Sequence, residues 1–203
     1  IIEHDHDFNI WAYARIDTVK EEYLETLKKA GVNWLALGIE SGNKTVRKDV
    51  VKGKFTEVNI SDLVNKVKDA GINVIGNYIF GLPEDTVDTM QETLDMSMDL
   101  NCEFANFYST MAYPGSKLYL EARKEGWELP ESYIGYSQHS YESKPLPTKH
   151  ISSSEVLGFR DKAFNEYYKN DKYLSSIEEK FGKETKKSIE DMTKHTLKRE
   201  ILK

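Results

Sequence analysis

The sequence predicts a parallel α/β fold followed by a C-terminal helical appendage. Apolar strand-like segments and amphipathic helix-like segments alternate four times before residue 110, and two of these units resemble each other. The character of the chain then changes after Lys124. Alternation of this kind is typical of parallel sheets, because each crossover between parallel strands needs a long connection, usually a helix. Periodicity does not decide whether the sheet is open or curved into a barrel.

The similarity between two strand–helix units is the clearest of these signals. Residues 27–33 (LKKAGVN) correspond to residues 67–73 (VKDAGIN). Each segment ends an expected helix with a glycine, Gly31 or Gly71, where a left-handed residue is favoured. The apolar side chains that recur at the helical period are Tyr23, Leu24, Leu27 and Ala30 in the first helix, and Ile60, Leu63, Val64, Val67 and Ala70 in the second.

Four strands are expected in residues 1–125. We expect them over residues 8–16, 34–40, 74–80 and 103–109, because these runs are short and rich in apolar residues. A third helix is expected to begin at Asp85 or Thr86, to turn Val87, Met90 and Leu94 inward, and to end before Asn101.

Residues 126–203 have a different pattern and are expected to form a separate extension. Residues 126–150 contain three prolines and no clean period, which indicates a long ordered loop. Ser152 and Glu155 form a capping-box motif at the start of an amphipathic helix. A second helix is expected over residues 173–181, ending at Gly182, and a third from about Thr185 to the end of the chain. On that third helix Arg199 and its basic neighbours are expected to face solvent.

Composition excludes several classes of protein. The formal net charge of −6 argues against a nucleic-acid or anionic-membrane partner, and no apolar run approaches the ~20 residues of a membrane span. The single cysteine, Cys102, has no partner for an internal disulfide, and we expect it to be a small buried residue. These features favour a cytoplasmic protein.

Polar residues and glycines gather where the expected strands end. Arg15 ends the first strand, Glu40 and Ser41 the second, and Asn77 precedes the Gly81 turn after the third. In parallel α/β folds ligands bind at these ends. Each feature also has an ordinary explanation: Glu40 as a turn residue that caps the next helix, and residues 81–86 as a turn followed by a helix cap. Their recurrence at successive strands is what favours a binding site.

The motifs resemble a known family. WAYARID at residues 11–17, LGIESG at 37–42, Lys52, NYIFGLPEDT at 77–86 and YPGS at 113–116 are similar in order and spacing to the later strands of radical S-adenosylmethionine (SAM) enzymes. The likeness is greatest to the branch that often carries an N-terminal cobalamin-binding domain. It covers residues 8–120 well and implies a partial TIM-type (βα) barrel over residues 1–125, with residues 126–203 as a loop and helical extension.

The resemblance also implies a set of SAM contacts. Glu40 and Asn77 would lie beside the ribose and amino-acid parts of SAM, and Arg15 or Lys52 would meet its carboxylate. A solvated loop lysine is an equal alternative for Lys52. The expected SAM-binding residues are Arg15, Glu40, Ser41, Lys52, Asn77, Ile79, Phe80 and Gly81.

The chain lacks the three cysteines, spaced C-x3-C-x2-C, that hold the [4Fe–4S] cluster in this family. The resemblance therefore implies a C-terminal fragment of a parent enzyme that forms a 5′-deoxyadenosyl radical for methyl transfer or rearrangement. Whether the parent also uses cobalamin stays open. The fragment alone is expected to be inactive and to hold no metal. Its partners would be the missing N-terminal portion or, through the edge near residues 8–16, a second copy.

Substrate contacts are expected at Tyr108, Tyr113 and His139, although a packed loop histidine is an equal alternative for His139. Two other functions stay open at this point. One is a different parallel α/β metabolic enzyme, and the other is a non-catalytic binding or scaffold protein that has lost the cluster. The substrate itself is not predicted.

Overall fold

The computed structural model describes residues 1–4, 6–50 and 58–203. Its strands are β1 (Ile10–Arg15), β2 (Val32–Glu40), β3 (Asn73–Phe80) and β4 (Phe104–Ser109). Its α-helices are α1 (Leu24–Lys29), α2 (Lys44–Val50), α3 (Ile60–Asp69), α4 (Val87–Leu100), α5 (Lys117–Lys124), α6 (Ser153–Tyr168), α7 (Asp171–Phe181) and α8 (Lys183–Met192). The short 3-10 helices are η1 (Ile2–His4), η2 (Ile16–Thr18), η3 (Glu21–Tyr23), η5 (Tyr133–Tyr136) and η6 (Glu200–Leu202).

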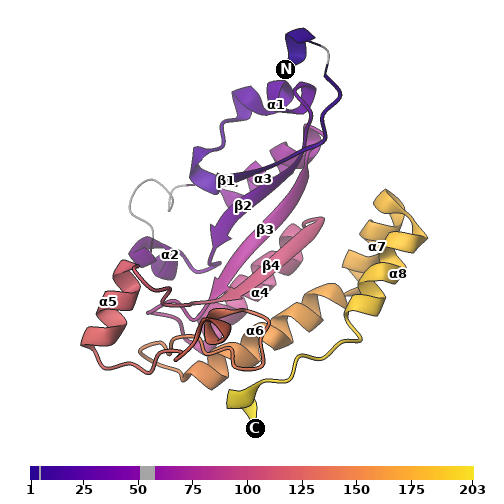
Figure 1. Cartoon of the computed structure of the whole chain (residues 1–203). Coiled ribbons are helices and arrows are strands. Elements are labelled where there is room, and N and C mark those ends of the chain that lie inside the picture. The colour runs from indigo at the N-terminus through magenta and orange to yellow at the C-terminus, as the bar shows by residue number, and fades with distance from the viewer. Residues whose placement is uncertain (5, 51–57) are drawn as a thin grey trace.

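The strands form one parallel sheet in the order β1-β2-β3-β4 (Figure 1). This confirms the parallel α/β prediction, and each expected strand lies within two residues of its predicted ends. The glycine stops are confirmed as well: Gly31 and Gly71 have φ of +93° and +78°. A Cβ on Gly31 would lie 2.3 Å from the carbonyl oxygen of Phe8, so this position excludes larger residues.

The hydrophobic core lies on one face of the sheet. Alternate residues of β2 and β3, such as Leu37 and Tyr78, are fully buried there beneath α1, α3, α4 and α6. Tyr167 and Tyr168 of α6 and Tyr173 of α7 belong to the same core, so the C-terminal helices are packed on the strands. The division of the chain at residue 125 stays a prediction.

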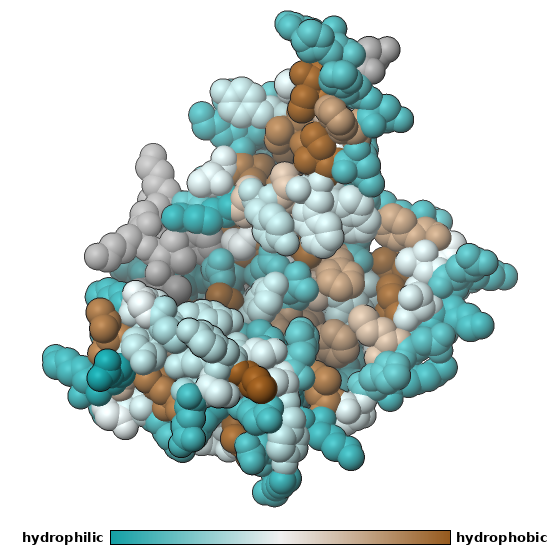
Figure 2. All heavy atoms as spheres, viewed as in Figure 1, coloured by the Kyte–Doolittle hydropathy of each residue, from teal (hydrophilic) through white to brown (hydrophobic). Residues whose placement is uncertain are grey.

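The opposite face of the sheet is open. It carries Trp11 and Tyr13 of β1, whose stacked rings are more than half exposed, together with half-buried Asn77 and Asn106. Figure 2 shows this side of the molecule, where pale and brown side chains surround a hollowed centre bordered by hydrophilic ones. In the described residues, no helix is both long enough and apolar enough to cross a membrane.

Several local expectations were wrong. Val87 and Tyr23 are half-exposed and do not face the core. The last helix ends at Met192 and does not continue to the end of the chain. Arg199 is only 4% exposed, because its guanidinium binds Asp161 and two carbonyl oxygens of the loop, and these bonds hold the tail away from a helical path. By contrast, Cys102 is fully buried, as predicted.

The helix caps follow the sequence closely. Thr86 caps α4, and Ser152 with Glu155 forms the predicted capping box of α6. Asp85 has another role, since its carboxylate accepts hydrogen bonds from the Leu82 amide and the Thr89 hydroxyl and closes the turn after β3. The cap of α2 is Asn43, whose side-chain oxygen accepts from the amides of residues 45 and 46. Glu40 is therefore not needed as a cap.

Candidate functional site

An open hollow of about 440 Å³ lies over the carboxyl halves of all four strands, on the open face of the sheet. We call it the strand-end hollow. Its lining residues are Tyr13, Ala14, Arg15, Ala36, Gly38, Glu40, Asn77, Ile79 and Tyr108. Four of the expected SAM-binding residues, Arg15, Glu40, Asn77 and Ile79, are thereby brought together from three strands. Tyr108, an expected substrate contact, joins them from the fourth.

Glu40 is held in the hollow by an unusual backbone. Its φ is +66°, in the left-handed region that costs a non-glycine residue roughly 1 kcal/mol or more, and the register between β2 and β3 shifts between Gly38 and Glu40. The carboxylate turns back over Gly38, where a Cβ would stand 2.7 Å from Glu40 Oε1. Gly38 is thus required by the position of this carboxylate, and the strain marks Glu40 as a functional candidate.

The electrostatics of the hollow centre on Glu40 and Arg15. Burial raises the pKa of Glu40, and the positive charge of Arg15 opposes that rise. The Arg15 guanidinium makes a bidentate pair with Asp17, with Nε–Oδ1 and Nη2–Oδ2 distances of 3.0 and 2.6 Å. The hollow therefore offers a cation on β1 and a carboxylate acceptor on the neighbouring β2, where Arg15 pairs with Gly38, two residues before Glu40.

Asn77 is fixed at the floor of the hollow. Its Nδ2 donates to the carbonyl oxygen of Leu37 at 3.3 Å, and its Oδ1 accepts from Nδ2 of Asn106 at 3.0 Å. This pair of bonds sets the orientation of the amide across β2, β3 and β4. Ile79 lies two residues further along β3 on the same face and supplies an apolar wall.

The other expected SAM contacts lie elsewhere. Ser41 is buried and its hydroxyl lies 3.2 Å from that of Thr93. Phe80 points to the core face, where it stacks on Phe107, and its carbonyl oxygen accepts from Thr110. Gly81 packs against Val156 of α6. None of these three lines the hollow, and Lys52 lies outside the described residues.

The expected substrate contacts divide in the same way. Tyr108 and His139 line a second pocket of about 330 Å³, which we call the edge pocket because it lies beside β4. Tyr113 lines neither cavity; its ring lies 6.1 Å from that of Tyr136. Sequence reasoning did not find Arg160, which also lines the edge pocket. A signal was present, because Arg160 lies at helical spacing between Val156 and Ala163 on the buried face of α6.

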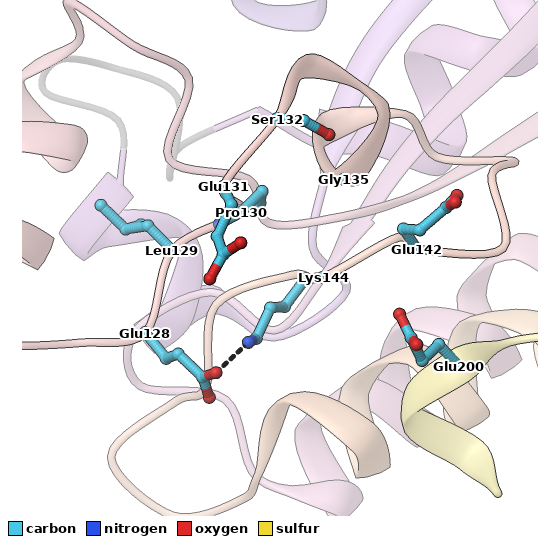
Figure 3. Close-up of a pocket in the computed structure, with 9 residues that line it drawn as sticks. All are labelled: Glu128, Leu129, Pro130, Glu131, Ser132, Gly135, Glu142, Lys144 and Glu200. Atoms are coloured by element: carbon cyan, nitrogen blue, oxygen red, sulfur yellow. Dashed lines mark ion pairs between the residues drawn. The ribbon is translucent and has the colours of Figure 1, made fainter.

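A third cavity of about 390 Å³ is acidic, with four glutamates in its lining. Figure 3 shows it between the loop and η6, with the Lys144 ammonium directed at the Glu128 carboxylate, with which it forms an ion pair. Three further glutamates, Glu131, Glu142 and Glu200, line it, and no strand contributes. We call it the acidic pocket. It shares no lining residue with the strand-end hollow.

Comparison with known proteins relates most of the sheet to a known domain family. Residues 11–97, from β1 to the last turns of α4, match the family model of the radical SAM superfamily. This segment is a radical SAM domain. The domain shares its fold with TsrM, a radical SAM methyltransferase from Kitasatospora setae solved with cobalamin and a [4Fe–4S] cluster bound: TM-score 0.50, 20% identity, over 57% of this chain and 21% of that one. The predicted fold class, a partial TIM-type barrel with parallel strands, is confirmed.

Relatives of the radical SAM domain include methyl-transferring enzymes. The chain is 25% identical over 168 residues to an uncharacterized methyltransferase of Pyrococcus horikoshii, covering 83% of this chain and 36% of the relative. It is 35% identical over 100 residues to a putative methylthiotransferase of Methanocaldococcus jannaschii, covering 49% of this chain and 22% of the relative. The chain thus spans only about a fifth to just over a third of their lengths.

The described residues do not fit an iron–sulfur cluster. No group of three or more His, Cys, Asp or Glu side chains within residues 1–4, 6–50 and 58–203 is arranged to hold a metal ion. The one cysteine of the sequence is fully buried, and burial raises the pKa of its thiol to about 11, which opposes the thiolate form that iron requires. The strand-end hollow, in contrast, suits the hydroxyls, charges and apolar surface of a nucleoside-containing ligand.

Proposed function

We propose that the strand-end hollow binds SAM and that this chain is the SAM-binding side of a radical SAM enzyme that transfers a methyl group or rearranges its substrate. The observation that carries the proposal is the convergence of Arg15, Glu40 and Asn77 in one hollow of about 440 Å³. SAM would supply the methyl or 5′-deoxyadenosyl group of the reaction. The names of two relatives, a methyltransferase and a putative methylthiotransferase, support a group-transfer reaction.

Each polar group of the hollow matches one part of SAM. Glu40 accepts hydrogen bonds from hydroxyls of the ribose, Asn77 presents an oriented amide, and Arg15 attracts the methionyl carboxylate. Ile79 lies where an adenine ring packs against an apolar surface. Burial raises the pKa of Glu40, so its carboxyl keeps a proton to a higher pH than an ordinary glutamate. This affects ligand binding, because a protonated carboxyl loses acceptor capacity.

The iron–sulfur cluster and any cobalamin belong to other parts of the complete protein in this proposal. The outer edge of β1 is where the sheet would continue, either with strands of the preceding segment of the same protein or with a second copy of the chain. A reducing, cytoplasmic location is part of the same proposal, and the single buried cysteine supports it.

Calorimetric titration of the 203-residue chain with S-adenosylhomocysteine tests the SAM site. Glu40→Ala and Asn77→Ala should each weaken binding by about tenfold, the loss of one well-placed hydrogen bond to a charged or oriented group. Two exposed residues of the same types, Glu131 in the acidic pocket and Asn65 on α3, give matched controls: Glu131→Ala and Asn65→Ala should leave affinity unchanged. Equal losses in all four variants would contradict the proposed site.

A further inference from the structure

The edge pocket lies against the strand-end hollow, and the two share one wall. Tyr108 of β4 lines both cavities and is 37% exposed. The edge pocket is lined by segments that are distant in sequence: β4, the loop at His139, α6, and the end of α8 with the tail that follows it. A molecule held in it would therefore lie directly beside whatever occupies the strand-end hollow.

The pocket carries an excess of positive charge. Arg160, whose side chain is 5% exposed, gives one hydrogen bond from Nε to the carbonyl oxygen of Phe107 at 2.8 Å and one from Nη1 to Asp161 at 2.9 Å. Arg199 binds the same carboxylate with Nε–Oδ2 and Nη2–Oδ1 distances of 2.7 and 2.8 Å. One carboxylate thus faces two guanidinium groups, and one positive charge is left uncompensated by it.

The remaining polar groups do not cancel this charge. Among the described residues, Nη2 of Arg160 has no hydrogen-bond partner, and none of the residues that line the pocket is acidic. Burial and the nearby guanidinium groups of Arg160 and Arg199 lower the pKa of His139, so that its imidazole is neutral at pH 7. A buried, uncompensated guanidinium is costly by itself and favours an anion.

The walls around Arg160 are aromatic and apolar. Phe104 of β4 and Phe164 of α6 contribute rings, and the Arg160 guanidinium lies 5.6 Å from the centre of the Phe164 ring. Met192 and Leu197 close the side formed by the end of α8 and the tail. These surfaces match a flat, largely apolar molecule better than a sugar or a peptide, whose many polar groups would go unpaired.

We propose that the edge pocket binds the substrate of the reaction and that this substrate is a flat, largely apolar molecule with a carboxylate group. The carboxylate meets Arg160, the flat portion lies between Phe104 and Phe164, and the end nearest Tyr108 faces the strand-end hollow. Calling the ligand a substrate rests on the proposed SAM site, whereas the binding preference itself does not.

The test uses two probes of the same shape, 2-naphthoate and its neutral counterpart 2-naphthamide, titrated into the 203-residue chain and followed by amide chemical shifts in NMR. We expect 2-naphthoate to bind about tenfold more tightly than 2-naphthamide, the difference that a charge-assisted hydrogen bond gives. Shifts should concentrate in residues 104–108 and 160–164. Equal affinity of the two probes, or shifts centred on the acidic pocket, would overturn the inference.

Variants separate the pocket from general effects on folding. Arg160→Gln should remove the preference for the anion, and Arg123→Gln, at an exposed arginine on α5, is its matched control. Because Arg160 also supports the backbone of β4, Leu197→Trp offers a second route: it fills the pocket from the tail and leaves the hydrogen bond from Arg160 to Phe107 intact. It should weaken both probes by about tenfold or more, and unaltered binding would count against the pocket.

The outcome is distinguishable from that of the SAM proposal. Glu40→Ala should weaken S-adenosylhomocysteine and leave 2-naphthoate unaffected. If S-adenosylhomocysteine binds but the chain does not prefer 2-naphthoate, the substrate class is wrong and the SAM site stands. If 2-naphthoate is preferred but S-adenosylhomocysteine does not bind, the pocket is an anion site and its role as a substrate site fails.

Discussion

The two edge strands of the sheet, β4 and β1, differ in whether their outer backbone groups are hydrogen-bonded. Along β4, the outer backbone groups are bound by side chains from later in the sequence. The Tyr168 hydroxyl bonds both the amide and the carbonyl of Ala105, and the Gln138 side chain does the same for Ser109, with distances of 2.6 to 3.0 Å. Tyr167 and Tyr173 reach the carbonyl oxygens of Cys102 and Glu103 just before the strand.

Along β1 the outer edge has no such covering. Among the residues that the structure describes, none hydrogen-bonds to the backbone of residues 11–14 from the side away from β2. An unpaired edge is a template for another strand, whereas an edge whose groups are already bound is not. A further strand can therefore pair with this sheet at β1. At β4, α6 and the loop after α5 occupy the backbone groups that a further strand would need.

The largest expected effect on stability is at the hydrogen-bonded edge, β4. Tyr168→Phe removes one hydroxyl but leaves two backbone groups of Ala105 unsatisfied in a buried setting, so it should lower the free energy of unfolding by about 1–3 kcal/mol. Urea denaturation measures it. Tyr13→Phe, on the open edge, is the matched control and should change stability by less than about 0.5 kcal/mol. Similar losses in both variants would show that the edges do not differ.

The open edge is tested by self-association. We expect the 203-residue chain to associate through β1, and Tyr13→Lys should weaken this association by about tenfold, since a charge on an edge strand opposes strand pairing. Sedimentation equilibrium provides the measurement. Tyr133→Lys, at a tyrosine that is also exposed but lies in the loop, should have no effect. A monomeric wild type at high concentration would refute the expectation.

A smaller effect is expected where the loop meets β4. Gln138→Ala should lower the free energy of unfolding by about 1 kcal/mol, because two hydrogen bonds to Ser109 at a part-buried position are replaced by water. Hydrogen exchange at the Ser109 amide should become faster while exchange in β2 is unaltered. Gln91→Ala, which breaks an exposed bond to Asp95, serves as control. Unchanged exchange at Ser109 would contradict this role of the loop at β4.

The smallest effect concerns Glu40, beside the open edge. Burial raises its pKa, so the folded chain binds the proton more tightly than the unfolded chain, and the stability it contributes is present at low pH and lost as pH rises through the folded pKa. Glu40→Gln should therefore be more stable than the wild type at pH 7, by less than about 1 kcal/mol. The gain should disappear below the ordinary carboxyl pKa of 4.5. A variant that is less stable at pH 7 would contradict this sign.

Part of the candidate site could be predicted from the order of residues along the strands. The two-residue period of a strand puts Asn77 and Ile79 on one face of β3 and Phe80 on the other. The structure agrees with this period, because Asn77 and Ile79 line the hollow and Phe80 is buried on the core face. The left-handed backbone of Glu40 was not foreseeable, because that conformation is rare for glutamate and depends on the register shift between β2 and β3.

The sequence by itself determined the local elements of this protein: the alternation of strands and helices, the glycine stops at residues 31 and 71, and the caps at Thr86 and Ser152. These depend on residues within one or two turns of one another, which is why the pattern suffices. Only the tertiary structure decided which edge of the sheet is closed and that Arg199 is buried beside Asp161. Those outcomes join residues 29 to 70 positions apart, and a local sequence pattern does not show which distant partner satisfies a buried polar group.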